Sequence, residues 1–210
     1  MKVVKQSVEI MGCGGLPIDG KAMLKHIELC GRVCYKSEDK ITGESAEKFV
    51  RRIIKSGHES VLEHASITVR FVCDRGVSHE IVRHRIASYS MESTRYCDYS
   101  KDKFGGEISV IAPEGVERAA WEESCACAEA VYGRMVRSGV SVQMARAVLP
   151  TCLKTELIMT ANLREWRHFL KLRTSEAAHP QIRALAVELR DKLRAAVPVV
   201  FDDVGGGDGD

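Results

Sequence analysis

Residues 65–73 constrain the fold most, because apolar and polar side chains alternate along this segment. The apolar positions are Ile67, Val69, Phe71 and Cys73. A period of two is typical of a strand with one buried face, and residues 155–162 are also predicted as a strand. Predicted strands and helices do not alternate strictly along the chain, which favours an α+β fold with a central antiparallel sheet packed with helices.

The 210 residues are enough for one domain with a sizeable core. We assign residues 1–204 to this single domain and residues 205–210 to a disordered, glycine-rich tail. Further strands are predicted at 2–10 and 107–112. Helices are predicted at 22–35, 45–55 with Ser45 as N-cap, 78–88 with Ser78 as N-cap, 114–138, 141–149, 163–173 and 180–196.

Charge and hydropathy exclude several classes of protein. The formal net charge is only +2, whereas wholesale binding to nucleic acid or to an anionic membrane usually needs a larger basic excess. No apolar run approaches the roughly 18 residues that span a bilayer. The first residues carry no signal-peptide pattern, so we expect a cytoplasmic protein.

The eight cysteines are expected to be free thiols, buried or incidental, because the chain is long enough to fold without disulfides and contains no Cys-x-x-Cys pair. Two histidines and two glutamates within residues 58–64 invite a zinc hypothesis. However, His58 and His64 lie six positions apart, and zinc-binding helices place two histidines four apart. We therefore predict a polar loop that lines a site, and no metal.

Residues 83–96 concentrate arginine, histidine, serine and tyrosine side chains, which favours recognition of a polar, anionic, planar ligand. On the predicted helix, Glu80, Arg83 and His84 share one face with Ala87. Arg83 and Arg85 diverge by roughly 200° around the same axis, so one pocket cannot easily use both. Either Arg85 forms a structural pair, or two sites meet at a subunit interface.

The spacing of these residues resembles a family signature. Arg83-His84-Arg85, then Ser93 and Arg95-Tyr96, is similar to the central motif of the flavin-dependent thymidylate synthases. Residues 58–64, 145–150 and 162–173 resemble further segments of that family. The resemblance extends over residues 20–190 in the same order.

The resemblance implies an α+β enzyme that makes dTMP from dUMP. It implies 5,10-methylenetetrahydrofolate as the one-carbon donor and FAD, reduced by NADPH, as the hydride source. It also implies a homotetramer whose active sites use several chains, so that Arg83 and Arg85 need not serve the same pocket.

The resemblance also implies roles for individual residues. Arg173 would be catalytic: its guanidinium would polarise the uracil ring, without a covalent enzyme nucleophile. The implied dUMP-binding set is Glu80, Arg83, Met91, Glu92, Ser93, Thr94, Arg95, Arg146 and Arg173. The implied FAD-binding set is His58, Ser60, Arg83, His84, Arg85, Asn162, Arg164 and His168.

Met91 departs from the family pattern, which usually has Glu or Gln there, so either a side-chain hydrogen bond is absent or Glu92 provides it. Arg167 and Lys171 are interpreted as a solvated basic face.

Two other functions are weighed against the resemblance. One is a nucleic-acid-binding module using the Arg83–Arg95 cluster, which the small net charge and the 6% aromatic content disfavour. The other is a thymidylate synthase that uses Cys152 as nucleophile, for which the sequence offers no obvious activating base.

Overall fold

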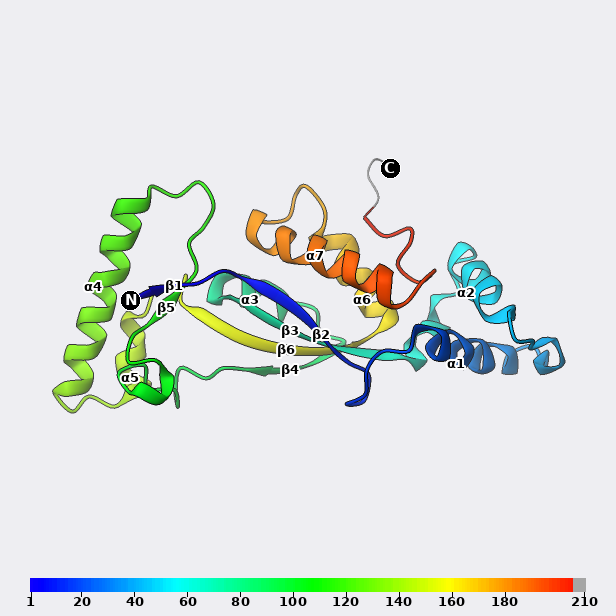
Figure 1. The fold of residues 1–210 in the computed structure, drawn as a ribbon, viewed down its shortest axis with the longest axis horizontal. Coiled ribbons are helices and arrows are strands. Elements are labelled where there is room, and N and C mark those ends of the chain that lie inside the picture. Colours follow the sequence, from blue (N-terminus) through cyan, green and yellow to red (C-terminus); the bar gives the residue numbers. More distant parts are fainter. Residues whose placement is uncertain (206–210) are drawn as a thin grey trace. The chain divides into compact units, whose positions relative to one another are not determined.

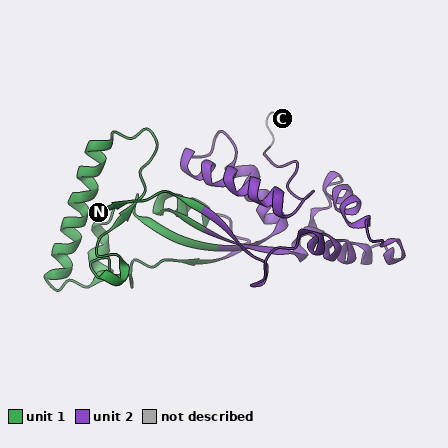
Figure 2. Cartoon of the chain, viewed as in Figure 1, with its two compact units in different colours: residues 1–7, 71–83, 89–158 green, residues 8–70, 84–88, 159–210 purple. Residues whose placement is uncertain are grey.

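The computed structural model describes residues 1–205, and the chain forms two compact units (Figure 2). Unit 1 contains residues 1–7, 71–83 and 89–158, and unit 2 contains residues 8–70, 84–88 and 159 to the end of the described chain. Of the predicted tail, residues 206–210 lie outside the described residues. Gly205 lies within them, and its carbonyl accepts a hydrogen bond of 2.6 Å from Nη1 of Arg190.

The main sheet has four strands in the order β2-β3-β6-β4 (Figure 1). These strands are β2 (Ser7–Gly12), β3 (Ser66–Asp74), β6 (Lys154–Asn162) and β4 (Ala87–Met91). In β3 and β6, every second side chain is buried, as the alternation predicted. The structure therefore confirms an α+β fold with an antiparallel sheet and helices.

A second, two-stranded sheet lies in unit 1. Strands β1 (Lys2–Val3) and β5 (Ser109–Val110) pair in parallel, with Lys2 opposite Ser109 and Val3 opposite Val110. The single strand predicted at 2–10 is wrong, because β1 pairs with β5 while β2 joins the main sheet. The strand predicted at 107–112 shortens to β5.

Helices of unit 1 are α3 (Arg75–Ile81), α4 (Arg118–Arg137) and α5 (Val142–Ala145), with 3-10 helices at Asp102–Phe104 and Arg146–Val148. Its core gathers side chains from α4, α5, β5 and the loops beside them. These are Tyr99, Ile108, Val110, Cys125, Tyr132, Ala145 and Leu153.

In unit 2, α1 (Gly20–Val33) packs on α2 (Ser45–Lys55), and α6 (Leu163–Arg173) packs on α7 (Pro180–Ala196). Short 3-10 helices lie at Glu38–Lys40 and, as η2, at Glu59–His64. The bounds of α6 and α7 are those predicted, because local signals fix them: the Asn162 side chain caps α6, and Pro180 opens α7. Ser45 is not the N-cap of α2; its hydroxyl donates to Glu28 instead.

The prediction for residues 78–88 is wrong in a way that changes the site. Helix α3 begins earlier, because the Asp74 carboxylate caps the backbone N–H of Val77 at 2.7 Å, and it ends at Ile81. Residues 82–86 form a turn and a bend, and the chain then enters strand β4. Consequently Arg83, His84 and Arg85 are not helical, and the shared helical face with Glu80 does not exist.

None of the helices within residues 1–205 is both long and apolar enough to cross a membrane.

Candidate functional site

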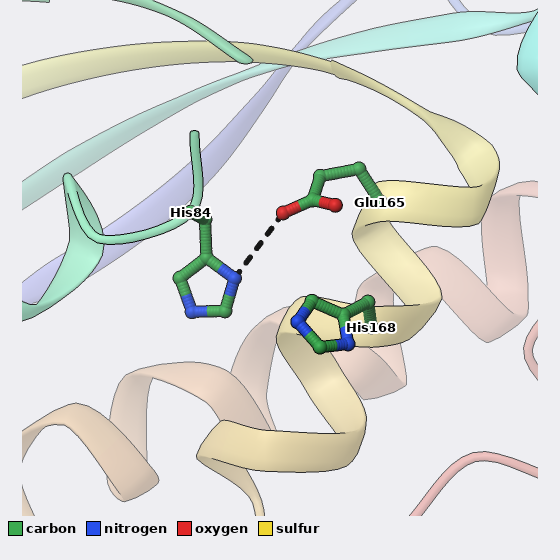
Figure 3. Close-up of side chains that lie close together, drawn as sticks. All are labelled: His84, Glu165 and His168. Carbon is green, nitrogen blue, oxygen red and sulfur yellow. Dashed lines mark ion pairs between the residues drawn. The ribbon is translucent and has the colours of Figure 1, made fainter. Parts of the chain in front are cut away.

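In unit 2, His84 lies against Glu165 (Figure 3) and also contacts Arg173. His84 and Glu165 are buried, and Arg173 is half-buried. Helix α6 carries Glu165 and Arg173, and His84 lies in the segment that precedes β4. Nε of Arg173 donates a hydrogen bond of 3.1 Å to Nε2 of His84, and Nδ1 of the same ring lies 3.3 Å from Oε1 of Glu165. The structure thus brings together two predicted site residues, His84 and Arg173.

The imidazole of His84 is neutral at ordinary pH. Burial, assisted by the charges of Arg173 and His168, lowers the pKa of His84 to about 4. Burial also raises the pKa of the Glu165 carboxyl above its usual value, while His168 opposes this shift. Edge contacts with the rings of Phe169 and His168 hold the imidazole in place.

His84, Glu165 and His168 are also a set that could ligate a metal, since one ligand atom of each lies within 4.8 Å of the others. The electrostatics oppose a cation there. The guanidinium of Arg173 already donates to His84, so a divalent ion at the other ring nitrogen would face a fixed positive charge across a single ring. The cluster is better suited to holding a proton on Nδ1.

A cleft of ≈1220 Å³ opens beside this cluster in unit 2, so it is somewhat larger than a typical small-molecule pocket of roughly 300–1,000 Å³. Its lining includes three residues of the predicted flavin set: Asn162, Arg164 and His168. Asn162 has a structural task as well, because its side-chain oxygen caps α6. Arg164 pairs with Glu63 at 2.6 Å, but both side chains are about half exposed.

His58 and Ser60 line a second cavity of ≈770 Å³ in unit 2, which Arg164 also lines. The segment from Glu59 to His64 is a 3-10 helix rather than the predicted loop. Its polar residues line cavities: Glu63 contributes to the larger one and Ser60 to the smaller. That either cavity is a ligand site stays a prediction.

Of the predicted dUMP residues in unit 1, all but Glu80 and Arg83 gather around the turn after β4. Nη1 of Arg146 lies 3.4 Å from the hydroxyl of Thr94, and the hydroxyl of Ser93 accepts from the backbone N–H of Arg95. The side chain of Arg95 bonds to Gln143 at 3.2 Å. This turn follows a strand, not a helix as expected, but it still brings a guanidinium, hydroxyls and backbone N–H groups together.

The structure gives Glu92 internal partners. Its carboxylate accepts from the hydroxyl of Tyr99 at 2.7 Å and from Nζ of Lys154 at 2.9 Å. Met91 ends β4 and is 38% exposed. Met91 cannot form the side-chain hydrogen bond of the family pattern. Glu92 could replace it only after this internal network rearranges. Ligand binding by either residue stays a prediction.

Arg83 and Arg85 are both exposed, and the chain passes from unit 1 to unit 2 between Arg83 and His84. Within residues 1–205 the guanidinium of Arg85 forms no ion pair, and its place at a subunit interface stays a prediction. Glu80 lies in α3, in unit 1.

Two findings on α6 differ from the sequence analysis. Arg167 is not part of a solvated basic face: it is 8% exposed and pairs with Glu59 and Asp203, whereas Lys171 is exposed as predicted. Glu165 was missed as a site residue. Its spacing of three from His168 on one helix was the available signal.

The cysteines are all free thiols. Cys152 packs against the core of unit 1, with its sulfur 3.4 Å from that of Cys125, and burial raises the pKa of the Cys125 thiol. For Cys125, an apolar neighbourhood favours the thiol form, which is a poor nucleophile.

We expect the Cys152→Ala variant to keep near-normal enzymatic turnover, because the Cys152 side chain belongs to the packing around the core of unit 1. A steady-state assay of product formation checks this. A fully inactive variant with an unchanged circular dichroism spectrum would restore the cysteine-nucleophile hypothesis.

Known proteins resemble this chain over most of its length. A family model described as thymidylate synthase complementing protein matches residues 20–199. The flavin-dependent thymidylate synthase of Geobacter sulfurreducens is 39% identical over 202 residues, covering 89% of this chain and 87% of that protein. The flavin-dependent thymidylate synthase of Mycolicibacterium vanbaalenii is 38% identical over 208 residues, covering 88% and 80%.

A solved structure shares the fold. The UMP/dUMP methylase PolB from Streptomyces cacaoi, bound with 5-Br dUMP, superposes with a TM-score of 0.77 at 23% identity, and the match covers 96% of each chain.

Proposed function

The chain belongs to the flavin-dependent thymidylate synthase family, and we propose that it converts dUMP to dTMP with 5,10-methylenetetrahydrofolate as one-carbon donor and NADPH-reduced FAD as hydride source. Family membership makes it a flavin-dependent enzyme of thymidylate synthesis. The identity of the co-substrates and the roles of single residues are part of the proposal.

The observation that carries the proposal is the cleft of unit 2, whose lining combines Asn162, Arg164 and His168 with further arginines. These donors fit the pyrophosphate of FAD, because guanidinium groups bind phosphate oxygens in a fixed fork. The exposed Arg164–Glu63 pair can open at little cost, since such surface pairs contribute about 0–1 kcal/mol. In the proposal, FAD supplies the hydride when bound.

The turn at 91–95 suits the phosphate of dUMP. Arg146 and Arg95 supply positive charge, and Thr94 and Ser93 supply hydroxyls beside them. Arg173 is proposed to lie against the uracil of bound dUMP. A guanidinium next to N3 and a carbonyl oxygen favours the deprotonated ring and makes C5 electron-rich, so the enzyme needs no covalent nucleophile.

We also propose that the protein forms a homotetramer whose active sites are built from several chains. A cytoplasmic location is part of the same proposal. The exposed guanidinium of Arg85, without an ion pair in residues 1–205, supports a role at a subunit interface. Analytical ultracentrifugation tests the assembly.

The purified protein is expected to show the absorption bands of an oxidised flavin, or to acquire them on titration with FAD, because the arginines of the cleft are proposed to bind the phosphates of that cofactor. Adding NADPH should bleach the bands. Adding dUMP and 5,10-methylenetetrahydrofolate to the reduced enzyme should then yield dTMP, measured by chromatography. A protein that never takes up FAD would overturn the proposal.

A further inference from the structure

We propose that Glu165 is a positioning residue that fixes the tautomer of His84, and that His84 in turn orients the guanidinium of Arg173. The inference rests on the proposed function only for the role of Arg173 in turnover. Its structural part concerns the three side chains themselves.

The geometry assigns a direction to each contact. Arginine nitrogens only donate, so Nε2 of His84, 3.1 Å from Nε of Arg173, must be the acceptor. In a neutral ring the single proton then sits on Nδ1. That nitrogen lies 3.3 Å from Oε1 of Glu165, within ion-pair distance but without the alignment of a full hydrogen bond (Figure 3). The carboxylate therefore acts on the Nδ1 proton through its proximity and its negative charge.

The surroundings favour this arrangement over a mobile one. His84 is 4% exposed and Glu165 is 7% exposed, so water competes little for either side chain. Burial keeps the His84 ring neutral, as its lowered pKa indicates. The backbone N–H of Glu165 donates a hydrogen bond to the side chain of Asn162. This bond fixes the position of the Glu165 backbone, from which the carboxylate extends.

The consequence for Arg173 follows from the planarity of its guanidinium. A hydrogen bond at Nε fixes the plane of the group and hence the directions in which Nη1 and Nη2 donate. If the carboxylate beside Nδ1 were removed, the Nε2–H tautomer would gain population. Its proton would face the N–H of Arg173, and the guanidinium would have to turn away.

The test compares Glu165→Ala with Glu165→Gln in the full-length flavoprotein. The alanine variant keeps the backbone N–H that donates to the capping side chain of Asn162, but it removes the carboxylate. The glutamine variant keeps an acceptor oxygen at that place. Nitrogen-15 NMR of the histidine rings reads the tautomer, with His84 assigned by the absence of its signals in His84→Gln. The control is Glu188→Gln, which alters an exposed pair with Lys192 on α7.

We expect Glu165→Ala to lose the Nδ1–H tautomer and to lower kcat for dTMP formation by roughly 10- to 100-fold, as misplacing a catalytic group does. KM for dUMP and the flavin bands should change far less. Glu165→Gln should restore the tautomer and most of the turnover, and Glu188→Gln should match the wild type.

An alanine variant with the wild-type tautomer and normal kcat would overturn the inference. If the alanine variant fails to fold, the Glu165→Gln variant decides the question. A low kcat in a Glu165→Gln enzyme whose His84 still carries its proton on Nδ1 would contradict the positioning role. A near-normal kcat with the same tautomer would support it. Normal turnover in Arg173→Ala would instead overturn the proposed function at Arg173. Inactive Arg173→Ala beside a fully active Glu165→Ala would overturn only the positioning role.

Discussion

The Arg173→Ala variant is expected to bind FAD and lose dTMP formation, with kcat lower by roughly 10²–10³-fold or more. Removing a preorganised donor at the reacting centre costs about that much. FAD should stay bound, because Arg173 is not among the residues that line the large cleft of unit 2. Flavin absorbance measures cofactor retention, and rapid-quench detection of dTMP measures turnover.

Two variants control for charge and position. Arg173→Lys keeps the positive charge but loses the planar fork, so it should recover little of the turnover. Arg137→Ala removes an exposed arginine at the end of α4 and should be fully active. Near-normal dTMP formation in Arg173→Ala would remove this residue from the catalytic step.

The Arg167→Ala variant is expected to lose about 1.5–3 kcal/mol of unfolding free energy, the usual contribution of a hydrogen bond to a charged group. The Arg167 side chain is buried, but its carboxylate partners are partly exposed, so solvent weakens the pairing. Nη1 of Arg167 donates to Asp203 at 2.6 Å and to the carbonyl of Val200, and Nη2 donates to Glu59 at 2.9 Å. Without it, two carboxylates and a buried carbonyl lose their shared donor. Urea unfolding followed by circular dichroism measures the change.

The matched control is Lys171→Ala, an exposed cation on the same helix, which should stay within about 0.5 kcal/mol of the wild type. A loss for Arg167→Ala as small as that of Lys171→Ala would contradict the structural role. The pH dependence of unfolding should also differ between the Arg167→Ala variant and the Lys171→Ala variant. The Arg167 hydrogen bond lowers the pKa of Asp203, so this contribution is present above the ordinary Asp pKa and is lost as pH falls through the lowered value.

Two segments show where local sequence signals suffice and where they fail. The sequence predicted α6 and α7 to the residue, because caps and a 3.6-residue period are local signals. It failed at residues 78–88, where β4 follows α3. There the backbone N–H of Glu92, directly after β4, bonds to the carbonyl of Glu156 at 2.9 Å, and no helical period records a partner so far away in the chain.

The candidate site divides in the same way. The spacing of Arg83, His84, Arg85 and Ser93 was enough to indicate the family, because a long motif of directed donors seldom arises by chance. That spacing did not indicate that Glu165 faces His84. The carboxylate belongs to another element, and its burial becomes visible only after folding.

The fold class, the family and the presence of cations along α6 could all be predicted from the amino-acid order. The partner of each cation depended on the folded chain. Arg167 and Arg173 share one helix, yet one binds Asp203, 36 positions later, and the other binds His84, 89 positions earlier. The sequence determines which side chains carry a charge. The partners of each charge and its desolvation depend on the residues that folding brings beside it.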